Sequence, residues 1–99
     1  MNYNDLKNQI KNIKRLKVES IGRSWDNNDI FSVSTFFDDR PWVIIQGAIH
    51  AREHLSTDFI VYLISVLDRN YDYYKSLSNF PNVCFIPMLN PDGVQIVHF

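Results

Sequence analysis

The stretch WVIIQGAIHAREH, residues 42–54, decides the fold, because an apolar run breaks at a glycine and is followed by two histidines, an arginine and a glutamate within five positions. Residues 42–45 form a nearly continuous apolar run, which predicts a strand covered on both faces. The β-branched residues and Gly47 indicate that this strand ends just before His50. A helix is expected to begin two or three residues later, which places His50 in the loop between the two elements.

The residues that follow predict a helix and a second strand. Apolar residues recur on one helical face as far as about residue 69: Leu55, Phe59, Leu63, Val66 and Leu67. NVCFIPML, residues 82–89, indicates another buried strand and runs into NPDG, residues 90–93, a turn signal. Strand, helix and strand in this order predict two parallel strands joined by a crossover helix. Sites in such sheets lie beyond the carboxyl ends of strands, where residues 50–53 and 90–93 both fall.

The residues that come before predict a helix and a hairpin. Apolar residues at helical spacing, with lysines between them on a solvated face, indicate an amphipathic helix over residues 1–17: Leu6, Ile10, Ile13 and Leu16. VESIG, residues 18–22, and IFSVSTFF, residues 30–37, flank a turn-rich DNND segment and predict an antiparallel pair. The chain is therefore expected to form a single α/β domain, with a mixed β-sheet and flanking helices.

Composition limits the classes of partner. The chain has 99 residues, of which 45% are hydrophobic, and a net charge of −1. It should therefore fold, without the basic surface that binds nucleic acid or anionic lipid. The N-terminus is polar and lacks the apolar core of a secretory signal, and no apolar run approaches the roughly 20 residues of a membrane span. We expect a cytoplasmic protein with no nucleic-acid or membrane partner, although a leader removed earlier would leave no trace.

Residues 50–54 fit two metal motifs. In the H-x-x-E motif, the imidazole of His50 and the carboxylate of Glu53 are both zinc ligands. In the H-x-x-E-H motif of the inverzincins, His50 and His54 bind the metal from one helical face and Glu53 is the base. The second motif needs a continuous helix through both histidines, whereas the predicted strand end places His50 in a loop. The sequence favours the first motif, with His54 as an ordinary helix residue.

Two linked motifs resemble a known family. GAIHAREHLST, residues 47–57, followed by a strand and MLNPDG, residues 88–93, is similar to the zinc carboxypeptidases of the carboxypeptidase A type. The resemblance covers most of residues 18–97. It implies zinc-dependent hydrolysis of peptide bonds, and a single incomplete domain in which residues 18–99 form the N-terminal portion of a zinc-carboxypeptidase-like (phosphorylase/hydrolase-like) domain.

The resemblance also assigns roles by position. His50 and Glu53 would be zinc ligands, Arg52 a cation that contacts the substrate, and residues 90–93 a structural turn beside the cleft. NPDGVQIV is similar to bacterial members that act on γ-D-glutamyl bonds in peptidoglycan peptides. The resemblance therefore implies a peptide or a peptidoglycan peptide as substrate.

The family pattern further implies groups that have no counterpart in this sequence. It requires a downstream histidine as third ligand, a glutamate base nearer the C-terminus, and arginines that hold the substrate carboxylate. The chain offers only Glu19 besides Glu53, and only His98 after residue 54, so no catalytic residue is assigned within it.

The missing groups lead to an expectation about activity and to an alternative function. The isolated chain should be inactive, as the N-terminal part of a longer zinc metallocarboxypeptidase. The alternative is a non-catalytic remnant or assembly module with a vestigial metal half-site. A sheet cut short in this way also predicts self-association through an exposed edge.

Overall fold

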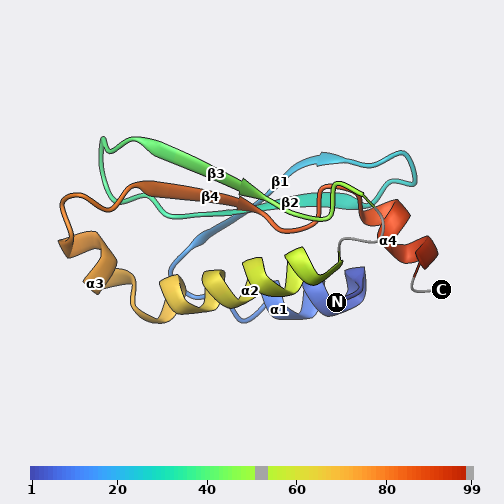
Figure 1. The fold of residues 1–99 in the computed structure, drawn as a ribbon, viewed down its shortest axis with the longest axis horizontal. Helices are drawn as coiled ribbons and strands as arrows, with labels where there is room; N and C mark the ends of the chain where they lie inside the picture. The colour runs from blue at the N-terminus through green and yellow to red at the C-terminus, as the bar shows by residue number, and fades with distance from the viewer. Residues whose placement is uncertain (51–53, 98–99) are drawn as a thin grey trace.

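The protein is described by a computed structural model that covers residues 1–50 and 54–97. Its elements follow one another as α1 (Tyr3–Ile10), β1 (Lys17–Arg23), β2 (Asp29–Ser34), β3 (Trp42–Gln46), α2 (His54–Arg69), α3 (Tyr71–Ser76), β4 (Asn82–Ile86) and α4 (Pro91–Val97). The strands form one sheet in the order β1-β2-β4-β3. Both α1 and α2 lie on the same face of that sheet (Figure 1). This arrangement confirms the predicted α/β class with a mixed sheet.

The sheet contains both predicted strand pairings. β1 and β2 pair antiparallel, and β3 and β4 pair parallel from Trp42 opposite Asn82 to Gln46 opposite Ile86. Since α2 and α3 lie between β3 and β4 in the chain, they form the crossover that parallel pairing requires. β4 also pairs antiparallel with β2 and is therefore a central strand. The carboxyl ends of β3 and β4 consequently lie next to each other.

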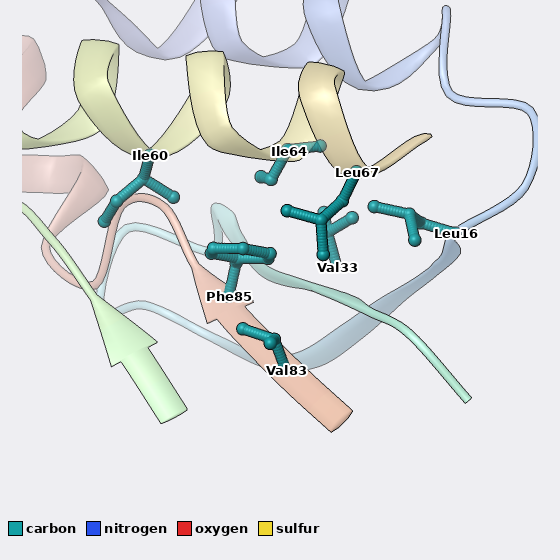
Figure 2. Close-up of a cluster of buried hydrophobic side chains, with 7 residues drawn as sticks. All are labelled: Leu16, Val33, Ile60, Ile64, Leu67, Val83 and Phe85. Atoms are coloured by element: carbon teal, nitrogen blue, oxygen red, sulfur yellow. The ribbon is translucent and has the colours of Figure 1, made fainter. Parts of the chain in front are cut away.

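The main core lies between the sheet and α2. Its side chains point toward one another from both layers in Figure 2, with one further residue from the segment before β1. The buried members are Val33, Val83 and Phe85 from the sheet, Ile60, Ile64 and Leu67 from α2, and Leu16. A second buried cluster joins α1 to α4 and to the loops after β3 and β4: Tyr3, Leu6, Ala48, Met88 and Val94. The two clusters fix both loops against the helical layer.

The first helix is shorter than the predicted span of residues 1–17. α1 ends at Ile10, and the chain continues through two tight turns before β1. A carboxylate from α2 explains the change, because Asp68 accepts hydrogen bonds from the backbone amides of Lys14, Arg15 and Leu16 at 2.7–3.2 Å. These bonds hold the segment in a non-helical conformation while Leu16 remains buried.

Asp68 should make the stability of the fold depend on pH. Burial alone would raise its pKa, but the amide bonds from Arg15, Lys14 and Leu16, together with the charge of Arg15, outweigh burial and lower it. Because the folded pKa lies below the unfolded value of about 3.9, the stabilisation is complete above that pH and is lost as the pH falls through the folded pKa.

We therefore expect Asp68→Asn to lose about 1 kcal/mol of stability at neutral pH and to lose less than the wild type on acidification. Urea unfolding between pH 7 and pH 3 measures both effects. Asp39→Asn is the matched control, since Asp39 is exposed. If the free energy of unfolding of Asp68→Asn falls with acidification as much as that of the wild type, this role of Asp68 is contradicted.

The prediction that residues 42–45 are covered on both faces is wrong for the described chain. β3 is an edge strand, and Trp42, Val43 and Ile44 are 48%, 43% and 66% exposed. Within residues 1–50 and 54–97, β3 pairs with β4 only, and the helical layer covers one face of the sheet. Of the five residues of β3, only Ile45 packs against the core.

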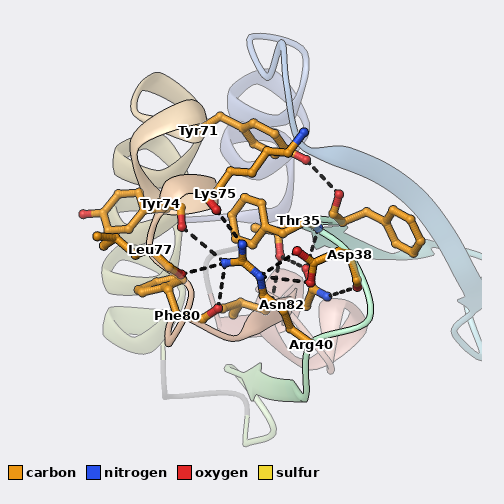
Figure 3. A network of polar contacts seen from close by, with 12 residues as sticks. Thr35, Asp38, Arg40, Tyr71, Tyr74, Lys75, Leu77, Phe80 and Asn82 are labelled. Carbon is orange, nitrogen blue, oxygen red and sulfur yellow. Dashed lines mark hydrogen bonds and ion pairs between the residues drawn. The ribbon is translucent and has the colours of Figure 1, made fainter.

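A buried polar network fixes the connection between β2 and β3 (Figure 3). The side chain of Asn82 is fully buried and accepts hydrogen bonds from the Phe37 amide at 2.7 Å and the Thr35 hydroxyl at 3.2 Å. Its amide group donates to the carbonyl of Asp38 at 2.9 Å. Nearby, the guanidinium of Arg40 donates to backbone carbonyls at the end of α3 and in the loop after it: Tyr74, Lys75, Leu77 and Phe80.

Two aromatic rings of α3, those of Tyr71 and Tyr74, are partly buried against the core, whereas Tyr73 is exposed. The centroid of the Tyr71 ring lies 5.0 Å from that of Phe37, and the centroid of the Tyr74 ring lies 4.8 Å from that of Phe80.

None of the helices in the part of the chain that the structure describes is long and apolar enough to cross a membrane.

Candidate metal centre

Backbone hydrogen bonds join the loops that follow β3 and β4. The Gly47 amide donates to the Ile86 carbonyl at 3.0 Å, and the Leu89 amide donates to the Gly47 carbonyl at 2.9 Å. One residue further along, the Asn90 amide donates to the Ala48 carbonyl at 3.0 Å. The two segments that the sequence placed at one edge of the sheet are therefore in direct contact for their described residues.

Gly47 allows the first turn of α2 to pack closely against this junction. A Cβ atom at Gly47 would come within 2.8 Å of the Ile60 side chain, 2.9 Å of the Ser56 hydroxyl and 3.2 Å of the Pro87 carbonyl. The Ser56 hydroxyl accepts a hydrogen bond from the Ala48 amide at 2.9 Å. The buried Thr57 hydroxyl donates to the Pro87 carbonyl at 2.7 Å. The glycine at the strand end thus leaves the space in which these groups pack closely.

Ala48 turns the chain out of the strand. Its φ of 52° lies in the left-handed region, which costs a non-glycine residue about 1 kcal/mol or more. The side chain is fully buried, and both its amide and its carbonyl are hydrogen-bonded. These contacts stabilise the strained conformation at the point where the chain leaves β3.

The NPDG motif supplies the N-cap and the first turn of a helix, which corrects the prediction of an ordinary turn at residues 90–93. Pro91 begins α4, and the Asn90 side chain accepts a hydrogen bond from the Gly93 amide at 3.0 Å, as an N-cap residue does. The same side chain donates to the Ile49 carbonyl at 3.3 Å. A Cβ atom at Gly93 would lie 2.6 Å from the Asn90 side chain. Glycine at this position leaves the space that Asn90 needs to reach Ile49.

Asp92 connects the same turn to the hairpin. Its carboxylate accepts hydrogen bonds from the Ser24 hydroxyl at 2.5 Å, the Asn28 side chain at 2.8 Å and the Asp26 amide at 3.0 Å. Burial raises the pKa of Asp92, but these bonds outweigh burial and lower it. The carboxylate therefore remains charged at neutral pH and holds the loop between β1 and β2 against α4.

The structure places His50 in an exposed bend, after β3 and before α2. Because α2 begins at His54, the two histidines do not share one continuous helix, so the inverzincin arrangement is wrong. The other predicted site residues, Arg52 and Glu53, lie outside the described residues, as does His98. Their roles as substrate cation and zinc ligand remain predictions.

The side chains of His50 and Glu53 suit zinc chemically, but two ligands make only part of a zinc site. An imidazole nitrogen and a carboxylate oxygen are both zinc ligands, but catalytic zinc sites use three protein ligands and structural sites use four. Among residues 1–50 and 54–97, no three histidine, cysteine, aspartate or glutamate side chains are grouped so that they could hold a metal ion. Glu53 lies outside these residues, so two ligands from His50 and Glu53 remain a prediction.

Sequence reasoning missed two residues that support the His50 loop. Ser56 accepts a hydrogen bond from the Ala48 amide, and Asn90 donates to the Ile49 carbonyl. The signal for Asn90 was present, because an asparagine directly before a proline is typical of a helix N-cap and first helical position. Ser56 carried no comparable signal, since its contact depends on how α2 packs against the loop.

Comparisons with known proteins agree with this architecture. The chain is similar to carboxypeptidase B of Astacus astacus, with 28% identity over 78 residues, which is 77% of this chain and 26% of that protein. It is also similar to a zinc carboxypeptidase of Saccharothrix mutabilis subsp. capreolus, with 26% identity over 88 residues, 81% of this chain and 20% of that protein.

Solved structures show the same fold. Carboxypeptidase A from Helicoverpa armigera matches with a TM-score of 0.78 and 24% identity, over 99% of this chain and 26% of that chain. Bovine thrombin-activatable fibrinolysis inhibitor, solved in complex with tick carboxypeptidase inhibitor, matches with a TM-score of 0.82 and 19% identity, over 99% of this chain and 33% of that chain.

The fold and the two linked loops thus define a piece of a carboxypeptidase-type α/β domain. The sequence profile of the zinc carboxypeptidases matches residues 3–99, almost the whole chain. The chain belongs to the zinc carboxypeptidase family. It spans only 26% and 20% of the lengths of the two sequence relatives.

Proposed function

We propose that this chain provides the N-terminal part of a zinc-dependent metallocarboxypeptidase and contributes two zinc ligands, His50 and Glu53. The observation that carries the proposal is the joined pair of loops at the carboxyl ends of β3 and β4, since ligand sites in α/β sheets lie at such ends. Membership of the zinc carboxypeptidase family gives this position its chemistry. The substrate class is a peptide or a peptidoglycan peptide.

Each residue has a role that the fold can support. The bend after Ala48 presents His50 at the surface, and Asn90 holds the carbonyl of the residue before it. Arg52 supplies a positive charge for the substrate. His50 and Glu53 would hold a zinc ion, which when bound would supply polarisation of a peptide carbonyl and of a water molecule. A third ligand, a general base and further substrate contacts must come from outside these 99 residues, so the isolated chain does not hydrolyse peptides.

Zinc titration by calorimetry tests this half-site. With two ligands the dissociation constant should be on the order of 1 µM to 1 mM, far weaker than a complete site. His50→Ala and Glu53→Ala should each weaken binding by about 10-fold or more, and the double variant should abolish it. His98→Ala is the matched control and should leave the affinity unchanged.

Two results would overturn the half-site. One is tight binding that survives the double variant, which would place the metal elsewhere. The other is binding as tight as that of a complete site and lost in the control, which would make His98 a ligand. A peptidase assay on the same samples should stay at the background rate.

A second candidate function is a non-catalytic assembly module with a vestigial half-site. It is favoured because the general base and the third ligand that the family pattern requires have no counterpart in this sequence. Both candidates place the half-site at His50 and Glu53, so zinc titration of this chain does not separate them. A reading frame that continues past Phe99 with a suitable histidine and glutamate would favour the enzyme, and one that ends without them would favour the assembly module.

A further inference from the structure

Three consecutive carbonyls, those of residues 47–49, each accept a hydrogen bond from the loop after β4. The first two accept from the backbone amides of Leu89 and Asn90, at 2.9 Å and 3.0 Å. The third, that of Ile49, accepts from the side-chain amide of Asn90 at 3.3 Å. Of these three bonds only the last is made by a side chain, and it holds the residue directly before His50. A substitution can therefore remove it and leave the two backbone bonds in place.

The side chain of Asn90 connects two elements through its two polar atoms. Its oxygen accepts a hydrogen bond from the Gly93 amide at 3.0 Å and so caps the N-terminus of α4. Its nitrogen donates to the Ile49 carbonyl, in the loop that carries His50. The side chain of Ile49 is 43% exposed, so packing alone holds this residue only in part. One amide group thus ties the backbone next to the predicted metal ligand to the start of α4.

We propose that Asn90 is a positioning residue for zinc, whose hydrogen bond to Ile49 restricts the positions that the imidazole of His50 can take. This inference rests on the proposed function, since it takes His50 as a zinc ligand. A ligand whose backbone is already fixed loses less conformational freedom when the metal binds, so the affinity is higher. Groups that orient a metal ligand are typically worth about 10- to 100-fold in affinity, and a contact one residue away should fall at the lower end.

Gly93 should act on the same loop through Asn90. A Cβ atom at this position would lie 2.6 Å from Nδ2 of Asn90 and 3.0 Å from its Oδ1. Contacts this short force the Asn90 amide to move, because it is the far end of a flexible side chain. The movement would break the bond to Ile49. The asparagine and the glycine of the NPDG motif therefore serve one hydrogen bond.

Zinc titration by calorimetry on the 99-residue chain and its Asn90→Ser variant tests the inference. Serine caps a helix as well as asparagine does, but its hydroxyl is too short to reach Ile49. We expect the dissociation constant for zinc to rise by about 10-fold, while the midpoint of urea unfolding stays near that of the wild type. Gln95→Ala is the matched control, because Gln95 is an exposed amide on the same helix, and it should leave both quantities unchanged.

Gly93→Ala approaches the same bond from the other side. It should also raise the dissociation constant for zinc by about 10-fold, although alanine favours a helix more than glycine does. Added to Asn90→Ser, it should have no further effect on the affinity, because no amide remains for the new Cβ atom to displace. A purely structural role of the two residues predicts instead that losses of affinity follow losses of stability.

The possible results separate this inference from the function on which it rests. If the wild type binds zinc and both Asn90→Ser and Gly93→Ala bind it equally well, the positioning role alone is overturned. Losses that add up in the double variant, or that appear only where the unfolding midpoint falls, also overturn it. A wild type that binds no zinc, or zinc binding that survives His50→Ala combined with Glu53→Ala, overturns the proposed function and this inference with it.

Discussion

Asn82→Ala should lower the stability of the chain by about 3 kcal/mol, a large part of the 5–15 kcal/mol typical of a domain. The wild-type side chain is fully buried and makes three hydrogen bonds, two of them to backbone groups of the segment after β2. Truncation leaves the Phe37 amide and the Asp38 carbonyl without these partners, and each unsatisfied buried group costs about 1–3 kcal/mol. Thermal or urea unfolding measures the loss.

Two further substitutions make the test specific. Asn82→Asp keeps the acceptor oxygen for Phe37 and Thr35 but replaces the donor to Asp38 with a second oxygen, so it should also be destabilising. Asn79→Ala, at an exposed position three residues earlier, should change stability by less than about 0.5 kcal/mol. Equal effects at Asn79 and Asn82 would show that the buried network does not stabilise the fold.

Arg40→Ala should cost about 2 kcal/mol, the second largest effect. Its guanidinium donates to the carbonyl of Leu77 at 2.8 Å and of Phe80 at 3.1 Å, and also to two carbonyls within α3. It therefore satisfies acceptors at a helix end and fastens α3 to the segment before β3. The side chain is only 12% exposed, so water replaces it poorly.

Arg40→Lys distinguishes these bonds from simple charge. Lysine keeps the charge but lacks the planar fork of donors, so it should recover less than half of the loss. Asp38→Ala removes the 3.0 Å ion pair to Arg40, yet Asp38 is 56% exposed and its loss should cost less than about 0.5 kcal/mol. If Arg40→Lys is as stable as the wild type, the carbonyl contacts are not the source of the stabilisation.

The order of elements could be predicted from sequence, because periodicity and turn residues are local. The strand that ends at Gly47, the helix that ends at Arg69 and the parallel pairing across them all follow from such patterns. The extent of the first helix could not be predicted in this way. Ile13 and Leu16 continue the helical spacing because they also face the core, while the bonds that end the helix come from Asp68, more than 50 residues away.

The exposure of β3 was missed for a different reason. A continuous apolar run indicates that a strand is stable when both of its faces are covered. It does not say which other elements supply that cover. Within the described residues, those layers reach only one face and one side of β3.

The sequence predicted which two loops form the candidate site, but not the backbone conformation within them. Strand ends and motif order placed residues near His50 beside the NPDG motif, and the described backbone bonds agree. The left-handed Ala48 could not be predicted, because alanine gives no signal for positive φ and the conformation is imposed by bonds on both sides of it. The turn signal of NPDG was ambiguous, since the first turn of a helix and a β-turn favour the same residues.

The central place of β4 has a consequence for how the sheet assembles. β4 is the last of the strands in the described residues, yet it lies between β2 and β3 and joins the hairpin to β3. Until residues 82–86 have been synthesised, β2 and β3 have no common neighbour, and α2 has only part of its core to pack against. Folding must therefore wait for contacts between distant parts of the chain, which is slow and leaves two strand edges open to misassembly on the ribosome.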